Sequence, residues 1–434
     1  MRVQLTPAQR PGSVRSRLST AACVLLATGL PAAAAADSGT QLDTSLLTYG
    51  EQGRAKVIEP TVRVSRLFSD GQTLSGQIAL DVITGASPSG ALPSGVTPPA
   101  TPAGGDQIQT VTAASGGGGG EHAPDPGAIP VVPFSDVRAA LDADWLKPFG
   151  PLTPSIGGHF SRERDYQSVG ATAKLALEML HKLTTVTVGA AINRDNVFPS
   201  GGTREPLADT TVIISTAWNP KNVTGGQVGV SQILSRRWML GVTGSRSVED
   251  GYLTEPYKVV SIMDPVTGIT VGQLTENRPT RRDRRDVLTS TVYHLDKDVI
   301  YLSHRYYWDD WGVHSNTIDG KYRIQFQNDK FLEPHLRYYW QTQADFYRLG
   351  LIQGEPVPAY ISADQRLGPL RTATIGANYG FTLPRTRGEF TVRAEYIVQF
   401  GKTNPNEVVG VQQGFDLMPP VNIGTILVTY SVPF

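Results

Sequence analysis

The chain has 434 residues, including 45 glycines and 31 prolines, and its 39 lysine and arginine residues are balanced by 39 aspartate and glutamate residues. A formal net charge of zero gives no electrostatic reason to expect nucleic-acid binding. After the amino-terminal region no apolar run reaches about eighteen residues, so the sequence predicts no membrane-spanning helix.

Residues 1–36 predict a secretory signal peptide. Four arginines precede an apolar run at 18–30, and small residues lead to an expected cleavage site after Ala36. The apolar run is too short to cross a bilayer as a helix. Because Cys23 is the only cysteine and lies in this segment, we expect the mature chain, 37–434, to contain no disulfide and no cysteine-bound metal.

Alternation of apolar and polar residues predicts about sixteen β-strands, with fourteen as the alternative. The clearest, "EFTVRAEYIVQF" at 389–400, places Tyr396 on one face and Arg393 and Glu395 on the other. Soluble β-sandwiches also alternate, so this pattern does not decide the architecture. The predicted strands are 42–50, 57–68, 72–83, 135–146, 153–163, 167–180, 183–194, 223–234, 237–248, 285–295, 298–309, 313–326, 331–343, 367–380, 388–400 and 421–434.

The lengths of the connections between these strands separate the two architectures. Counted from the amino terminus, every even-to-odd connection is short, and every long connection is odd-to-even. Short periplasmic turns, long extracellular loops and an even strand number are typical of outer-membrane barrels. The sequence therefore predicts the all-β class and a transmembrane antiparallel up-and-down β-barrel. The long connections are 84–134, 195–222, 249–284, 344–366 and 401–420. The first of them is rich in Pro, Gly and Ser, which predicts a flexible extracellular loop.

The carboxyl-terminal "TILVTYSVPF" supports a barrel. Chain ends are usually polar, whereas Tyr430, Val432 and Phe434 here share one strand face. We interpret these three residues as an assembly signal for the outer-membrane barrel assembly machinery, the alternative being the last strand of a soluble core. Five aromatic residues are expected in the outer aromatic girdle. They are Tyr306, Trp308, Trp311, Tyr338 and Trp340.

Several stretches together resemble an uncharacterised Gram-negative family, number 3570 of the domains of unknown function. They are "YGEQGRAKVIEP", "DVITGASPSG", "FSDVRAALDADW", "HFSRERDYQS", "GVSQILSRRW", "DGYLTEPYKVV" and "YSVPF". The resemblance implies an outer-membrane barrel in an extracytoplasmic electron-transfer or export system, with a periplasmic redox protein or lipoprotein as a partner. It supplies no catalytic residues, and the long insert at 84–134 departs from the simplest family pattern.

Strand parity also predicts which charged residues line the lumen. Charges of both signs in the lumen would either keep an open pore filled with water or close it by forming salt bridges. The predicted lumen residues are Asp81, Lys321, Arg323, Glu333, His335, Arg337, Arg393 and Glu395. A second set lies at the outer end of a strand, where guanidinium groups would bind lipopolysaccharide phosphates, or would simply be solvated. This set comprises Arg278, Arg281, Arg282, Arg284 and Arg285.

Enzyme chemistry has little support in the sequence. The seven histidines show no metal-ligand spacing and no haem attachment motif, so we expect neither a metal nor a cofactor. Two constellations could act in hydrolysis: His159 with Ser161, and the Asp309–Asp310 pair with His314. The leading interpretation is an outer-membrane channel, or a sheath for a partner protein. The alternatives are an outer-membrane lipase or protease and a structural or adhesive barrel.

Overall fold

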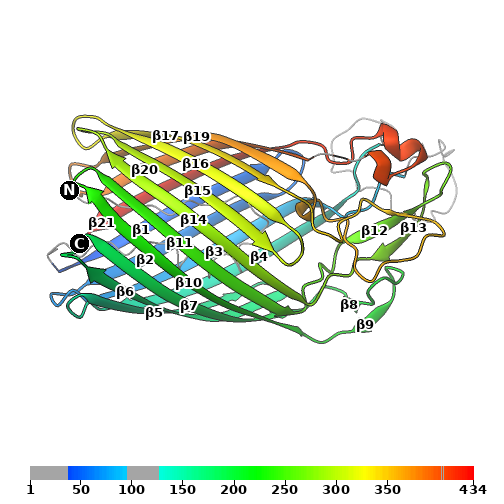
Figure 1. Cartoon of the computed structure of the whole chain (residues 1–434), viewed down its shortest axis with the longest axis horizontal. Helices are drawn as coiled ribbons and strands as arrows, with labels where there is room; N and C mark the ends of the chain where they lie inside the picture. Colours follow the sequence, from blue (N-terminus) through cyan, green and yellow to red (C-terminus); the bar gives the residue numbers. More distant parts are fainter. Residues whose placement is uncertain (1–37, 95–126, 402, 404) are drawn as a thin grey trace.

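Sixteen antiparallel strands close into a single barrel in the computed structural model, which describes residues 38–94, 127–401, 403 and 405–434 (Figure 1). The predicted signal peptide and its cleavage site lie outside the described residues. The barrel strands, in spatial order, are β1 (Gly39–Glu51), β2 (Lys56–Leu67), β3 (Thr73–Pro88), β4 (Val131–Leu146), β5 (Leu152–Arg162), β6 (Tyr166–Met179), β7 (Thr184–Val197), β10 (Asn219–Ser235), β11 (Trp238–Gly251), β14 (Arg281–His294), β15 (Val299–Asp309), β16 (His314–Gln325), β17 (Phe331–Gln341), β19 (Leu370–Thr382), β20 (Glu389–Gly401) and β21 (Val421–Pro433). The prediction of sixteen strands is confirmed, and fourteen is excluded.

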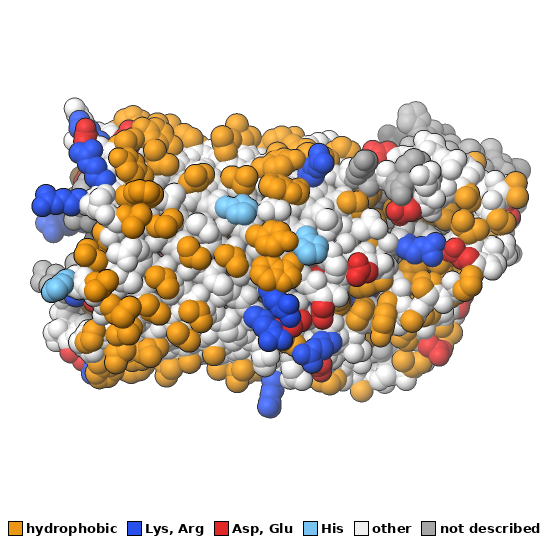
Figure 2. All heavy atoms as spheres, viewed as in Figure 1, with side chains coloured by type: hydrophobic (Ala, Val, Ile, Leu, Met, Phe, Trp, Pro, Cys, Tyr) orange, Lys and Arg blue, Asp and Glu red, His pale blue; other side chains and the backbone are white. Residues whose placement is uncertain are grey.

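The outer wall of the barrel is apolar because alternate strand residues point away from the lumen. On β3, Ile78 and Leu80 are about half exposed, whereas the neighbouring Asp81 is 2% exposed and points inward. The same alternation on the other strands places the hydrophobic side chains that Figure 2 shows over the barrel wall on its outer surface. A closed barrel with such a surface satisfies its backbone hydrogen bonds internally and presents apolar side chains to lipid. In the described residues, no helix is long and apolar enough to span a membrane.

The barrel closes between its first and last strands. β1 and β21 pair antiparallel, with Leu46 opposite Val428 and Thr44 opposite Tyr430. The Phe434 N–H donates to the Thr40 carbonyl at 2.8 Å, and the Thr40 N–H donates back at 3.0 Å. Phe434 therefore takes part in the ladder through its backbone, while its side chain remains 72% exposed.

Short turns gather at the end of the barrel that holds both termini, and the long loops gather at the other end (Figure 1). The turn between β16 and β17 uses Asn328 and Asp329 at φ 59° and 54°, values that Asn and Asp adopt more readily than most residues. The predicted parity of short and long connections is confirmed. At the loop end β3 extends to Pro88 and β4 begins at Val131. The connection between these strands is therefore shorter than the predicted loop at 84–134. Within that loop, 95–126 lie outside the described residues.

The long loops pack together into what we call the lid. It contains a sheet of β12 (Val259–Met263), β13 (Thr270–Thr275) and β18 (Leu351–Ile352), a hairpin of β8 (Thr203–Arg204) and β9 (Ile213–Ser215), and the short helices η1 (Gln365–Leu367), η2 (Pro405–Glu407) and η3 (Gly410–Gly414). Its hydrophobic core is formed by Leu92, Met263, Trp311, Val313, Ala344, Tyr347, Leu349, Leu367, Val408 and Leu417. These residues follow β3, β11, β15, β17 and β20, which are spread around the barrel, so their shared core lies over its outer mouth.

The aromatic girdle is confirmed only in part. Tyr306 and Trp308 stack with ring centres 5.4 Å apart, and Tyr338 and Trp340 lie 5.6 Å apart. Tyr306 and Tyr338 are each 39% exposed and point to the outside of the barrel. Trp311 was predicted to join them but is only 4% exposed, because it follows the end of β15 and turns inward into the lid core.

Candidate functional site

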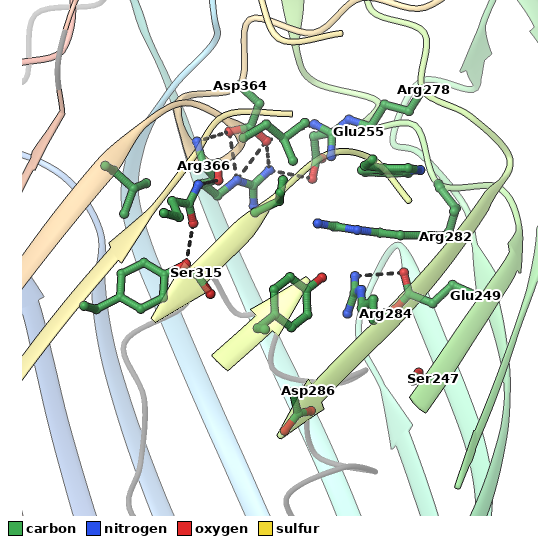
Figure 3. Close-up of a pocket in the computed structure, with 18 of the residues that line it drawn as sticks. Ser247, Glu249, Glu255, Arg278, Arg282, Arg284, Asp286, Ser315, Asp364 and Arg366 are labelled. Carbon is green, nitrogen blue, oxygen red and sulfur yellow. Dashed lines mark hydrogen bonds and ion pairs between the residues drawn. The ribbon is translucent and has the colours of Figure 1, made fainter. Parts of the chain in front are cut away.

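A cavity of about 450 Å³ lies inside the barrel beneath the lid (Figure 3). The barrel strands supply most of its wall, and the loop after β11, with Tyr252 and Leu253, supplies part of its cover. The wall combines aromatic and hydroxyl groups with seven basic and five acidic side chains. The basic residues are Lys221, Arg278, Arg282, Arg284, Arg305, Arg337 and Arg366, and the acidic residues are Asp165, Glu249, Glu255, Asp286 and Asp364. The cavity, which we call the chamber, therefore combines charged groups of both signs with apolar and aromatic surface.

Arg282 is held in the chamber from two sides. Its guanidinium group donates to Asp309 Oδ2 at 2.8 and 2.5 Å and stacks on Trp311, with its central carbon 4.3 Å from the ring centre. Asp309 also accepts from the Tyr307 hydroxyl and from the backbone N–H groups of Trp311 and Val313. The tight turn from β15 to β16 thus fixes both the carboxylate and the ring that orient Arg282.

Two further arginines line the chamber lower on β14 and β15. Arg284 donates to Glu249 at 2.8 Å, and Arg305 donates to both oxygens of Asp286 at 2.8 and 2.6 Å. Each pair joins neighbouring strands, so the guanidinium groups are fixed in place by the barrel wall.

A cluster of five charged residues, which we call the latch, connects two lid loops at the top of the chamber. Figure 3 labels Glu255, Arg278, Asp364 and Arg366 of this cluster. Glu255, Glu276 and Arg278 come from the loop after β11, and Asp364 and Arg366 come from the loop after β17. Arg278 lies 2.6 Å from Glu276 and 2.9 Å from Asp364, and Arg366 bridges Asp364 and Glu255. The latch therefore holds the two largest described loops of the lid together by charge.

Burial and charge act differently on the two buried carboxyl groups of the latch. Burial alone would raise the pKa of Asp364, but Arg366, Lys258 and Arg278 outweigh it and hold that pKa well below its usual range. Burial raises the pKa of Glu276, although Arg278 opposes this change. Asp364 is thus the firmly ionised member of the latch, and Glu276 is the member that takes up a proton more readily.

Below the chamber a second charged network crosses the inner wall. The two ring nitrogens of His335 lie 2.8 Å from Asp319 and 2.9 Å from Glu395. Arg337 donates to the same Asp319 oxygen at 2.7 Å. This network links β16, β17 and β20 across the lumen-facing surface, and it connects the chamber to the lower part of the barrel.

The family of the chain follows from a comparison of its sequence with family profiles. The profile described as "Protein of unknown function (DUF3570)" matches residues 15–432. The chain belongs to this family. No curated protein sequence matches the chain.

Among solved structures, this DUF3570 protein is similar to OccK5 (OpdH) of Pseudomonas aeruginosa, with 9% identity, 92% of this chain and 98% of that chain covered, and a TM-score of 0.39. OccK2 (OpdF) of the same organism, in complex with glucuronate, gives 11% identity, 92% and 98% coverage, and a TM-score of 0.40. CdiB from Acinetobacter baumannii gives 10% identity and a TM-score of 0.44, over 91% of this chain and 60% of that chain.

The structure places all eight predicted lumen residues of this DUF3570 protein on inward-facing strand positions. Asp81 forms an ion pair with Arg138, Arg323 stacks on Phe331 at 3.6 Å, and Glu333 is 6% exposed. Lys321 lies on the face of β16 that carries Asp319, and Arg393 lies on the face of β20 that carries Glu395. His335, Arg337 and Glu395 belong to the network below the chamber.

The five arginines predicted to bind lipopolysaccharide are divided between two faces of the barrel. Arg278 lies in the latch, and Arg282 and Arg284 line the chamber, so the prediction is wrong for these three. Residues alternate across the strand, and only Arg281 and Arg285 point to the outside. The prediction missed this division because β14 begins at Arg281, four residues before its predicted start, so the alternation of faces was not applied to these arginines.

The residues of the first predicted hydrolytic constellation share the inner face of the wall, whereas those of the second are divided between its two faces. His159 Nδ1 lies 2.6 Å from Asp142 Oδ1, and Ser161 is fully buried on the same inner face. Asp309 points into the chamber, whereas His314 points outward and contacts the Tyr306 hydroxyl. Asp310 accepts from the backbone N–H of Asp283. The reactive groups of the second constellation are therefore on opposite faces of the wall.

Sequence reasoning did not foresee one acidic cluster near the outer ends of β4, β5 and β6. Oxygen atoms of Asp136, Glu163 and Asp165 lie within 4.8 Å of one another. The Tyr257 hydroxyl from the lid donates to Asp165 at 2.8 Å. Carboxylate oxygens of this kind are ligands for hard cations. The spacing of the histidines in the sequence gives no information on a cluster that consists only of acidic residues from separate segments.

Proposed function

We propose that this protein is an outer-membrane channel for small solutes, with a lid over its outer mouth that must loosen for solutes to pass. A barrel of sixteen strands encloses enough space for an aqueous lumen. Charged and polar side chains line the described inner wall from the chamber to the network around His335. The chamber beneath the lid is the observation that carries the proposal.

The chamber favours small organic anions among possible solutes. Its volume of about 450 Å³ falls within the range of small-ligand pockets. Arg282, Arg284 and Arg305 are fixed by their carboxylate partners, so they need little reordering when an anion arrives. Trp311 and Tyr307 add apolar surface beside these groups. A carboxylate on a compact, partly apolar body suits this combination.

The position of the charges on the inner wall makes selectivity the test of this function. Replacing both Arg337 and Arg393 with glutamate should make the pore more selective for cations, because fixed charges along a pore set its ion preference. The measurement is the reversal potential across planar bilayers that contain the purified protein. Tyr338→Gln and Ala394→Ser alter the adjacent outward positions and should leave the reversal potential unchanged. Equal reversal potentials for wild type and the glutamate variant would contradict passage through this lumen.

A further inference from the structure

The outer wall of the barrel carries arginines at the level of its outer aromatic residues. Arg285 on β14 is the register partner of Trp308 on β15, and Arg371 on β19 is the register partner of Trp340 on β17. Outward aromatic residues of a barrel lie at the membrane–water interface. These arginines therefore lie at the depth of the lipid headgroups in the outer leaflet.

Arg285 has an arginine neighbour on the next strand. Arg246 on β11 is its register partner, and both guanidinium groups bind the carboxylate of Asp283, at 2.7 and 3.0 Å. The two side chains remain 59% and 47% exposed. One carboxylate neutralises only one of two guanidinium groups, so the trio keeps a single positive charge. Asp283 also aligns the two arginines side by side, which prepares them to bind a second anion together.

The other charged residues nearby lie on the lid side of the arginine pair. Arg281 and Asp250 are register partners further toward the lid and balance each other. Asp310 accepts a hydrogen bond from the Asp283 N–H at 2.8 Å, and so also lies on the loop side of Arg285. The patch as a whole is therefore neutral, with Arg246 and Arg285 on its membrane side and the carboxylates of Asp250 and Asp310 on its lid side.

Apolar side chains border the arginine pair on the side away from the lid. Val242, Val287 and Tyr306 are 43%, 38% and 39% exposed on the same outer face. Figure 2 shows such a cluster of basic and acidic side chains toward the loop end, next to a wall of hydrophobic and small residues. A ligand that binds here meets a cationic group above and an apolar wall below. That combination matches the phosphate and acyl chains of a membrane lipid.

We propose that Arg246 and Arg285 bind a phosphate group of an outer-leaflet phosphoglycolipid. Guanidinium groups bind phosphate oxygens through paired hydrogen bonds, and two adjacent groups can hold one phosphate between them. Free phosphate is a poor occupant because the pair lies on an open wall with no enclosing pocket. This site is independent of the channel function, since it lies on the opposite face of the strands from the chamber.

The test uses the full-length protein purified in detergent and titrated with diphosphorylated lipid A, with native mass spectrometry as the readout of bound lipid. Arg246→Gln/Arg285→Gln should weaken binding at least about tenfold, because charge-assisted hydrogen bonds are lost. The same lipid with both phosphates removed should bind wild type as weakly as the variant binds the intact lipid. Arg66→Gln removes an outward arginine at the periplasmic end and should leave binding unchanged.

Two results would overturn the proposal. One is equal binding of diphosphorylated lipid A by wild type and the double variant, with heat-modifiable migration showing that both barrels are folded. The other is displacement of the lipid by inorganic phosphate at millimolar concentration, which would assign the pair to a soluble anion. Failure of phosphate to displace the lipid supports a lipid phosphate as the ligand.

Discussion

The guanidinium carbon of Arg282 lies 4.3 Å from the ring centre of Trp311, so a residue of the barrel wall packs directly on the core of the lid. The Trp311 indole N–H also donates to the Arg281 carbonyl at 2.8 Å. Closure of the outer mouth and the position of a chamber arginine therefore depend on the same side chain. This connection allows the lid to be perturbed without altering the transmembrane strands.

Replacing Trp311 with alanine should loosen the lid while leaving the barrel closed. Truncating a buried aromatic side chain costs about 3–5 kcal/mol. Hydrogen–deuterium exchange should therefore accelerate at the lid amides of Ala344 and Asp345, whose N–H groups donate to the Leu367 and Trp311 carbonyls. Trp308→Ala removes an outward tryptophan from the same hairpin and serves as the control. Equal exchange rates in the two variants would contradict a role for Trp311 in holding the lid.

The latch gives a prediction for pH. Because the pKa of Asp364 is held well below its usual value, its contribution to lid closure is present above the unfolded pKa and is lost only as pH falls through the lower folded value. The pKa of Glu276 is raised, so its protonation as the pH falls favours the closed lid. Wild-type lid amides should exchange no faster at pH 5 than at pH 7, after correction for intrinsic rates.

Asp364→Asn should destabilise the closed lid. It leaves Arg278 and Arg366 with one carboxylate fewer, and breaking a buried ion pair in this way costs about 3–5 kcal/mol. Exchange of the lid amides should be faster in Asp364→Asn than in wild type at both pH values. Wild-type exchange that rises sharply at pH 5 would show that another group controls closure.

The orientation of the barrel can be tested with single cysteines, because the expected mature chain contains none. Val266, between β12 and β13, is 81% exposed, and Gln327 lies in the turn between β16 and β17. A membrane-impermeant maleimide added to intact cells should label Val266→Cys and spare Gln327→Cys. Permeabilised cells should label both. Labelling of Gln327→Cys alone in intact cells would invert the assigned topology.

Assembly should depend on the exposed ring of Phe434. Phe434→Asp keeps both backbone hydrogen bonds to Thr40 but removes the aromatic group, so we expect the protein to be degraded or retained in the periplasm. Thr429→Asp places the same charge on the inward face of β21 and should reach normal levels in the outer membrane. Normal heat-modifiable levels of Phe434→Asp would contradict an assembly role for the terminal ring.

The barrel could be predicted from the sequence because the two features that identify it are local. Alternation of side chains identifies each strand, as for Tyr396 and Glu395, and the lengths of the connections identify the two ends. The same alternation placed Arg337 and Glu395 inward without knowledge of their partners. Strand ends were less accurate, and a shift of four residues at the start of β14 left Arg282 and Arg284 grouped with the outward Arg285.

The lid and chamber could not be predicted, because they depend on contacts between loops far apart in the chain. Trp311 was predicted as a girdle residue since it lies three positions after Trp308, but the turn after β15 directs its side chain inward. The latch joins Arg278 to Asp364, 86 positions apart, and no local pattern indicates that these two residues pair. The arginine pair of the outer wall required the register of β11 with β14, which sequence periodicity does not supply.

Single-channel recording of wild type and Trp311→Ala in planar bilayers tests the proposed lid-covered channel most directly. We expect wild type to be closed for most of the record with brief openings, and Trp311→Ala to be open for a much larger fraction at the same unit conductance. Silence of both proteins, with heat-modifiable migration showing that each barrel is folded, would contradict a channel and favour a sheath whose lumen is filled.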